Sequence, residues 1–361
     1  MKKFYNIDKM MNTEADYKGL LGGRNIGKSY QVKLKALLKK AFENNSEFIY
    51  LRRYKEDMKN QLVTNYFADM NISEITNGNY NMLYTYQGII YFAIADENGK
   101  PTSKKQIGWA HNLATAEHYK SIMFPKVTDI VFEEFIPEKG TYLPNEPSKL
   151  QSYVSTIART RKVTVWLVGN TISKLCPYFT DWGLDRAINQ KLGTIDVYKR
   201  SVTVMTENGV IEDHITIALE RCKGEGLLSR MAFGDAAEMI ANNEWVTESK
   251  PLITKEAVND CNVRYTIYVF WQNLKFKCQL LYKDNNYFWY VKPASGKSKF
   301  EELLGERIIS DQVSFERLIT NRLRGLTPRE QKAFNIMLNK KIYYSDNTTG
   351  TDFENVLNSI K

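Results

Sequence analysis

Two different spacings of apolar residues occur in the first half of the chain. From residue 28 to residue 42 apolar side chains recur at helical spacing, and Asn44 and Asn45 end the run. Segments 114–123 and 148–161 also favour helix, whereas runs rich in β-branched and aromatic residues predict strands at 47–53, 82–86, 88–95, 129–135 and 163–170. The alternation over residues 17–170 predicts an α/β domain with a mostly parallel sheet, to which the 82–95 hairpin is an exception.

The second half of the chain has a different pattern. Strands are predicted at 194–205 and 211–219, and the segment around 242–251 resembles a linker. Beyond residue 251, three apolar runs separated by short polar turns predict a meander, followed by helices at about 299–305, 311–324 and 328–340. We therefore expect a first α/β domain at 1–195, a linker or lid at 196–250 and a smaller α/β domain at 251–361.

Composition narrows the class of protein. A chain of 361 residues suits two domains, and 50 Lys and Arg against 41 Asp and Glu give a net charge of +9, which favours a polyanionic partner. The 4 cysteines form no C-x-x-C pair and the 3 histidines are scattered, so neither a zinc site nor a disulfide framework is expected. The start of the chain has no apolar signal region, and the longest apolar run, near 88–95, is too short to span a membrane. A cytoplasmic protein that is not exported is expected.

One segment matches a phosphate-binding motif. The pattern G-x-x-x-x-G-K-[ST] is matched by Gly22, Gly23, Arg24, Asn25, Ile26, Gly27, Lys28 and Ser29. Glycines let backbone N–H groups face a phosphate, Lys28 suits the β and γ oxygens, and Ser29 suits a magnesium ion. The motif also opens the strongest predicted helix, whose positive end favours an anion. The sequence therefore predicts a nucleotide site.

A phosphate loop needs a second, acidic site across the sheet. The strand at 129–135 ends in Glu133 and Glu134, and we assign the magnesium ion to Glu133 and the attacking water to Glu134. Glu133 stands where aspartate is usual, so the division of roles between the two stays open. The strand at 163–170 ends in Asn170, a candidate sensor of the γ-phosphate.

Two further features concern the nucleotide and its hydrolysis. No N-K-x-D guanine signature is present, which favours ATP over GTP. Arg159 and Arg161, just before the strand at 163–170, are candidates for an arginine finger, and the residues alone do not choose between them.

Several motifs together resemble those of a known family. They are GGRNIGKSY, FIYLRRYK at 48–55, the stretches at 118–139 and 142–150, and GNTISKLCPYF at 169–179, all in the family's order. The chain thus resembles the DNA-encapsidation ATPases, the genome-packaging motors of small short-tailed bacteriophages, which are relatives of the large terminase subunits. The resemblance covers most of residues 17–180.

The resemblance implies a fold and an assembly. The fold is a P-loop NTPase of the additional-strand catalytic glutamate type, and the assembly is a homopentameric ring on the portal vertex of a prohead in the host cytoplasm. Arg159, rather than Arg161, falls where the family places the finger that reaches a neighbour's ATP, and Lys120 matches a second basic residue acting across subunits. Lys55, with Arg52 and Arg53, lies in a stretch near the nucleotide. Whether a packaging RNA takes part is left open.

In the terminase relatives the second domain is a ribonuclease H-like nuclease, whose metals need acids on its first strand. The corresponding run here, RYTIYVFW, has none, so we expect a degenerate, inactive nuclease fold that binds nucleic acid or the portal. The polar segment 96–105, expected to be a solvent-exposed loop, offers Lys100, Lys104 and Lys105 as candidates for DNA contact.

The predicted function is an ATP- and Mg²⁺-dependent double-stranded DNA translocase that packages a viral genome into a preformed prohead. The first alternative is another P-loop ATPase that remodels nucleic acid, such as a helicase-like protein, which would separate strands without a prohead. The second is a non-catalytic scaffold that binds nucleotide and nucleic acid, which would show no ATP turnover with DNA and magnesium.

Overall fold

The computed structural model describes residues 4–137, 142–170, 176–206, 209–224, 250–271, 274–294, 307–309 and 328–359. These residues fall into two units. The first holds the described residues up to 224 except 176–185, and the second holds 176–185 and the described residues from 250 onward. None of the helices in these ranges has the length and apolarity needed to cross a membrane.

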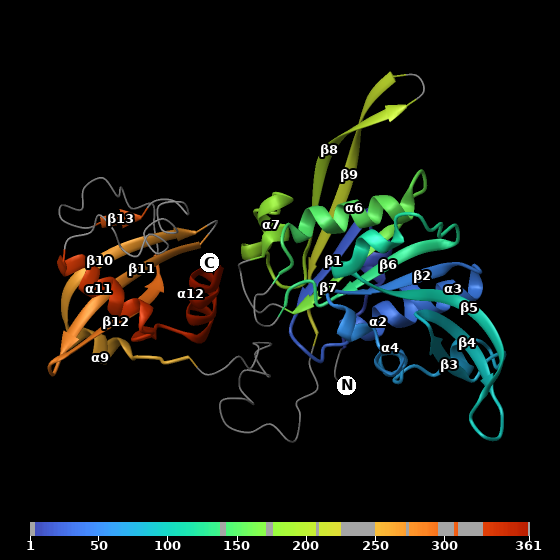
Figure 1. Cartoon of the computed structure of the whole chain (residues 1–361), viewed down its shortest axis with the longest axis horizontal. Coiled ribbons are helices and arrows are strands. Elements are labelled where there is room, and N and C mark those ends of the chain that lie inside the picture. The colour runs from blue at the N-terminus through green and yellow to red at the C-terminus, as the bar shows by residue number, and fades with distance from the viewer. Residues whose placement is uncertain are drawn as a thin grey trace. The chain divides into compact units, whose positions relative to one another are not determined.

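The first unit is built on one large sheet (Figure 1). Its strand order is β3-β4-β5-β2-β6-β7-β1-β9-β8, with a parallel block from β5 to β9 and antiparallel strands at both edges. The strands are β1 (Tyr17–Gly22), β2 (Glu47–Arg52), β3 (Met82–Tyr86), β4 (Ile89–Ala95), β5 (Pro101–Asn112), β6 (Val127–Glu133), β7 (Thr164–Asn170), β8 (Ile195–Thr206) and β9 (Gly209–Arg221). The predicted mostly parallel α/β sheet is confirmed, and β7 lies between β1 and β6.

Helices lie on both faces of this sheet (Figure 1). They are α1 (Asp8–Met11), α2 (Lys28–Gln31), η1 (Val32–Lys39), α3 (Lys40–Glu43), η2 (Lys55–Met58), α4 (Asn60–Tyr66), α5 (Ile72–Ile75), η3 (Leu113–Tyr119), α6 (Glu146–Ala158) and η4 (Ala187–Asn189). The predicted helix at 28–42 is the continuous run from α2 to α3, with π-helical geometry in η1. The predicted helix at 114–123 is shorter, because η3 is a 3₁₀ helix that ends at Tyr119.

Different helices pack their apolar side chains against the two faces of the sheet. On one face, Val32 and Leu37 of η1 and Phe67 after α4 join buried residues of β2 and β6 in one core cluster. On the other, α6 buries Leu150 and Ile157. Strands that are covered on both sides read as continuous apolar runs, and every residue of β1 is indeed buried.

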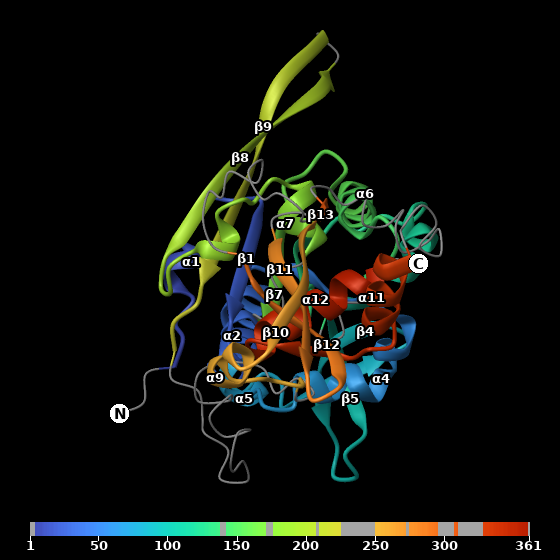
Figure 2. The same ribbon diagram turned by 90° about the vertical axis from the view of Figure 1, so that its left-hand side faces the viewer.

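Two hairpins extend beyond the helices and correct two expectations (Figures 1 and 2). Residues 96–105 are not one loop: the turn closes by Lys100, and Lys104 and Lys105 already lie on β5. Residues 196–221 are not a linker, since β8 and β9 pair along their whole length and β9 joins β1 in the large sheet.

The second unit contains a five-stranded sheet in the order β13-β10-β11-β12-β14. The predicted meander is confirmed, with β10 and β12 both antiparallel to β11. Its elements are α7 (Pro177–Asp181), α9 (Lys255–Asn259), β10 (Asn262–Trp271), β11 (Leu274–Lys283), β12 (Asn286–Pro293), β13 (Arg307–Ile309), α11 (Pro328–Leu338), β14 (Ile342–Tyr344) and α12 (Asn347–Ser359). The helix expected at 328–340 is α11, whereas those expected at 299–305 and 311–324 lie outside the described residues.

Candidate nucleotide site

The phosphate-loop motif forms a tight turn between β1 and α2. Asn25 and Gly27 have left-handed backbone conformations, with φ of 59° and 97°. At Gly22 an added Cβ would lie 2.9 Å from the Ile26 side chain and 3.2 Å from the Cys222 carbonyl oxygen, so the strand end has no room for a side chain. The loop therefore depends on glycine for both conformation and space.

Lys28 lies inside this loop. Its Nζ donates to the carbonyl oxygens of Gly22 at 3.1 Å and Gly23 at 2.6 Å, and to Oδ1 of Asn170 at 3.2 Å. The side chain is buried, and burial lowers the pKa of its ammonium group to about 8. The polar end of β7 therefore contacts the loop lysine directly.

Glu133 meets the loop from the end of β6. Its Oε2 accepts from the Ser29 hydroxyl at 3.2 Å, and its Oε1 accepts from the Tyr66 hydroxyl at 2.6 Å. Burial raises the pKa of this carboxyl group, although both hydrogen bonds oppose the shift. A carboxylate and a hydroxyl are hard oxygen ligands, and a buried acid gains from a nearby cation. Ser29 and Glu133 therefore fit a magnesium ion.

Glu134 follows directly but has a different environment. Its side chain is 54% exposed, and its Oε2 accepts from Nη2 of Arg52 at 2.9 Å. Arg52 also lies 3.5 Å from Oδ2 of Asp57. One acid of the pair is thus enclosed beside Ser29 and the other is open to solvent.

The backbone after β6 is held against β7. Glu134 has a φ of 55°, which is unusual for a residue with a side chain. The next residue, Phe135, donates its N–H to the Val168 carbonyl at 3.3 Å, and its buried ring covers Gly169. A tight approach of ring to backbone therefore fixes the chain just past the acidic pair.

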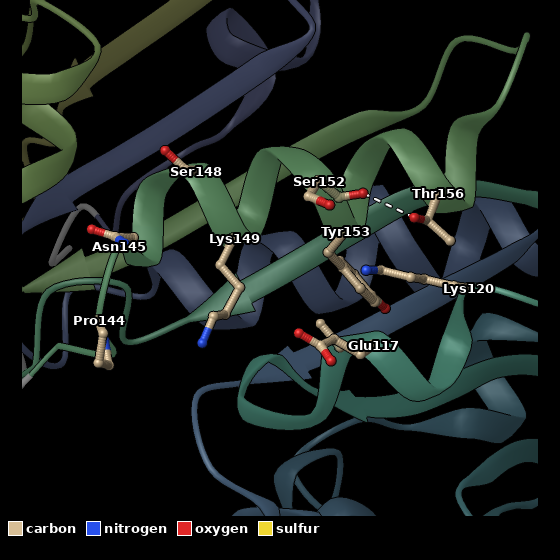
Figure 3. A pocket seen from close by; sticks show the side chains of 10 residues that line it. Glu117, Lys120, Pro144, Asn145, Ser148, Lys149, Ser152, Tyr153 and Thr156 are labelled. Carbon is tan, nitrogen blue, oxygen red and sulfur yellow. Dashed lines mark hydrogen bonds between the residues drawn. The ribbon is translucent and has the colours of Figure 1, made fainter.

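The remaining predicted nucleotide-site residues do not contact this group. Lys55 is exposed on η2. Lys120 follows η3 and lines a separate pocket of about 410 Å³ between η3 and α6, where it points toward Tyr153 (Figure 3). Arg159 is exposed at the end of α6, whereas Arg161 donates to the carbonyl oxygens of Phe124, Val127 and Ile157. The guanidinium group of Arg161 is thus bound to backbone carbonyl groups, whereas the side chain of Arg159 is exposed to solvent.

The three candidate DNA-binding lysines lie on the β4–β5 hairpin. Lys100 closes the turn, where its N–H donates to Oδ1 of Asp96 at 2.7 Å. The Nζ of Lys104 lies 4.6 Å from the ring centre of Tyr84, and that of Lys105 lies 5.8 Å from the ring centre of Phe42. Lys104 and Lys105 are neighbours on a strand, so they project from opposite faces.

Three contacts of this site were not predicted. The Arg52–Glu134 ion pair and the buried Arg53–Glu146 ion pair both arise from the RRYK stretch, which the motif comparison had placed only near the nucleotide. The hydroxyl of Tyr66 on Glu133 had no signal in the sequence, because it depends on how α4 packs against β2.

Residues 1–299 match the podovirus DNA encapsidation protein (Gp16) family. The chain belongs to this family. It is 31% identical over 252 residues to the DNA packaging protein of Bacillus phage B103, which covers 69% of this chain and 70% of the relative. It is also 30% identical over 258 residues to the DNA packaging protein of Bacillus phage phi29, covering 70% of this chain and 69% of the relative.

Two solved structures are also similar to the Gp16-family chain. The N-terminal domain of the DNA packaging ATPase from bacteriophage phi29 is 32% identical, with a TM-score of 0.44 over 54% of this chain and 92% of that one. A chain of the bacteriophage phi29 genome packaging motor assembly is 21% identical, with a TM-score of 0.49 over 99% of this chain and 98% of that one. Membership of the family rests on the sequence matches.

Proposed function

We propose that this protein is an ATP-driven translocase that packages double-stranded DNA into a preformed prohead. The observation that carries the proposal is the meeting of Lys28 with Asn170 and of Ser29 with Glu133 at one edge of the sheet, with Glu134 beside them. Family membership and the names of the relatives, which are DNA packaging proteins, support the packaging function.

Each side chain has a separate task in ATP hydrolysis. Lys28 and the loop N–H groups bind the phosphates, and we assign to Asn170 the sensing of the γ-phosphate, which its contact with Lys28 supports. Ser29 and Glu133 would hold magnesium, which would supply positive charge to neutralise the phosphate oxygens. Glu134 orients the attacking water and accepts its proton, and its solvent exposure leaves the carboxylate accessible to that water.

Two basic residues that lie away from the phosphate loop, Arg159 and Lys120, have a role if each subunit completes the site of its neighbour. We assign to Arg159 the arginine finger and to Lys120 the second basic contact to the ATP of the next subunit in a homopentameric ring. The exposed side chain of Arg159 and the backbone contacts of Arg161 support this choice. Such a ring would work at the portal vertex in the host cytoplasm, with DNA and the portal as partners.

The second unit is proposed as a nuclease-like domain without nuclease activity. In it β10, β11 and β12 form an antiparallel meander and β13 pairs in parallel with β10, which supports a ribonuclease H-like arrangement. The residues of β10 include no Asp or Glu. We assign to this unit the binding of nucleic acid or the portal.

A packaging reaction with purified proheads, DNA, ATP and magnesium tests the proposal. The wild-type protein should protect DNA from nuclease by enclosing it in the prohead. Lys28→Ala should abolish nucleotide binding, whereas Glu134→Gln should bind ATP but neither hydrolyse it nor package DNA. Normal hydrolysis by the Glu134→Gln protein would transfer the water-activating task to Glu133. Strand separation without a prohead would instead identify a helicase-like enzyme.

A further inference from the structure

The guanidinium group of Arg53 binds two parts of the chain at once. Its Nε and Nη2 donate to the carboxylate of Glu146 at 2.7 and 2.8 Å. Its Nη1 donates to the backbone carbonyl of Glu134 at 3.0 Å, and Nη2 also donates to the carbonyl of Phe135 at 2.9 Å. Arg53 therefore connects the turn after β6 to the first residue of α6.

Both members of this ion pair are shielded from water. Arg53 is 4% exposed and Glu146 is 1% exposed. The rings of Phe132 and Tyr142 each lie 5.4 Å from the guanidinium carbon. Glu146 also accepts from the N–H of Leu143 at 2.8 Å, so its carboxylate is fixed independently of Arg53. A buried, bidentate pair of this kind holds its partners in one geometry.

The turn that Arg53 holds is a strained one. Glu134 has a φ of 55°, and a non-glycine residue keeps such a conformation only where its surroundings enforce it. The two carbonyl groups bound by Arg53 are those of Glu134 itself and of the next residue. The neighbouring Arg52 contacts the Glu134 carboxylate instead, so consecutive arginines hold the side chain and the backbone of the same residue.

We propose that Arg53 and Glu146 are positioning residues for ATP hydrolysis: their ion pair sets the Glu134 backbone so that the carboxylate faces the attacking water. The proposal rests on the proposed function, because it assumes that Glu134 activates the water. The hydrogen bonds described above connect the pair to the Glu134 turn and to the segment that begins α6. Because Glu146 opens α6 and Arg159 follows its last residue, the pair also joins the Glu134 turn to the helix that presents the finger.

The test removes the pair while preserving its volume. Arg53→Met with Glu146→Leu replaces both charges by apolar groups, so neither is left buried alone. We expect this double variant to fold and to bind ATP with wild-type affinity, because the phosphate loop is unchanged. Its kcat should fall at least tenfold, since a displacement of about 1 Å in a catalytic group costs on the order of 10² in rate. Wild-type kcat in the folded double variant would overturn the proposal.

A matched control breaks a different ion pair of the same domain, one that involves β6. Lys40 pairs with Asp129 near the start of that strand, and Trp166 donates to the same carboxylate. Lys40→Met with Asp129→Asn keeps an acceptor for Trp166 and should leave the kcat of the folded protein unchanged. An equal loss of kcat in this control would show a general effect of weakening the domain and would overturn the assignment.

Two further variants complete the test. If the apolar pair does not fold, Arg53→Lys keeps a positive charge beside Glu146 but has no second arm for the two carbonyls. The Arg53→Lys protein should then show the same drop in kcat at constant ATP affinity, and a wild-type kcat in this variant would overturn the proposal. Glu134→Gln, measured alongside, separates the two hypotheses: if it hydrolyses ATP normally, the proposed function of Glu134 has failed, whatever Arg53 does.

Discussion

Nucleotide affinity should depend on pH through Lys28. Burial lowers the pKa of this ammonium group from 10.5 to about 8 in the free protein. A bound phosphate beside Nζ favours the charged form and raises the pKa again. Above pH 8, binding must therefore be accompanied by proton uptake, and affinity should fall as the pH rises.

The size of the effect follows from that pKa. The fraction of free protein with charged Lys28 falls from about nine-tenths at pH 7 to about one-tenth at pH 9, so affinity should drop about tenfold, or about 1.4 kcal/mol. The same shift acts on stability with the opposite sign. Between pH 8 and 10.5 the unfolded chain holds the proton and the folded chain does not, so the contribution of Lys28 to the free energy of unfolding rises with pH.

Titration calorimetry with Mg-ADP at pH 7, 8 and 9 measures both affinity and proton uptake, when each pH is repeated in buffers of different ionisation enthalpy. The terminal phosphate has a pKa of about 6 and loses its proton below this range, so uptake at pH 8 and 9 reports on the protein. Lys28→Arg is the matched control. Its guanidinium group stays charged over this range, so the nucleotide affinity of this variant should not depend on pH. A flat affinity with no proton uptake from pH 7 to 9 would refute the reasoning.

Three other outcomes follow from the proposed function. Arg159→Ala rings should lack ATPase activity, and mixing them with Lys28→Ala subunits should restore part of it above the value expected from dilution; no mixture would do so if Arg159 acted only within its own subunit. Alanine at Lys100, Lys104 and Lys105 should weaken duplex DNA binding for all sequences and lower the salt slope by about 0.9 for each lost phosphate contact, and an unchanged slope excludes the hairpin from DNA contact. The purified protein should leave DNA uncut in magnesium or manganese, as a gel of supercoiled plasmid would show.

Two kinds of feature of the candidate site could be predicted from the sequence: a motif that is contiguous in the chain, and residues that parallel strands bring to one edge of the sheet. The phosphate loop is one contiguous motif, and the carboxyl ends of parallel strands meet at one edge of a sheet. Glu133 and Asn170 could therefore be expected at the edge of the sheet that holds Lys28 and Ser29, and in the structure they contact Ser29 and Lys28 respectively. No local pattern indicates that Tyr66 approaches Glu133, since that contact depends on tertiary packing of α4.

The two fold corrections have physical causes too. The first half of β5 extends beyond β2, which pairs only from Gly108 onward, so residues 101–106 bond to β4 alone and tolerate polar side chains. The strands of the β8–β9 ribbon were expected, but their place in the large sheet depends on tertiary pairing: β9 joins β1 at its base, where Ile217 and Leu219 are buried. A polar strand with one partner, such as the first half of β5, resembles a loop in sequence, because no apolar face marks it.

The contact between Gly169 and Phe135 predicts a way to disturb the Glu134 turn without touching any charge. A Cβ at residue 169 would lie 2.7 Å from Cε1 of the Phe135 ring, which is 1% exposed and has no space to retreat. Gly169→Ala should therefore destabilise the domain by about 1–3 kcal/mol and lower kcat with little change in ATP affinity. Thermal unfolding and steady-state kinetics measure both.

Val168→Ala provides the control for that substitution, because Val168 packs in the core on the other face of β7. It should lose comparable stability and keep its kcat. Adding Phe135→Leu to Gly169→Ala should return part of the lost rate, since the smaller side chain makes room for the new methyl group. If Gly169→Ala loses stability but hydrolyses ATP at the wild-type rate, the position of Glu134 does not depend on the packing of Phe135 against β7, and the contacts of Arg53 alone must hold the turn.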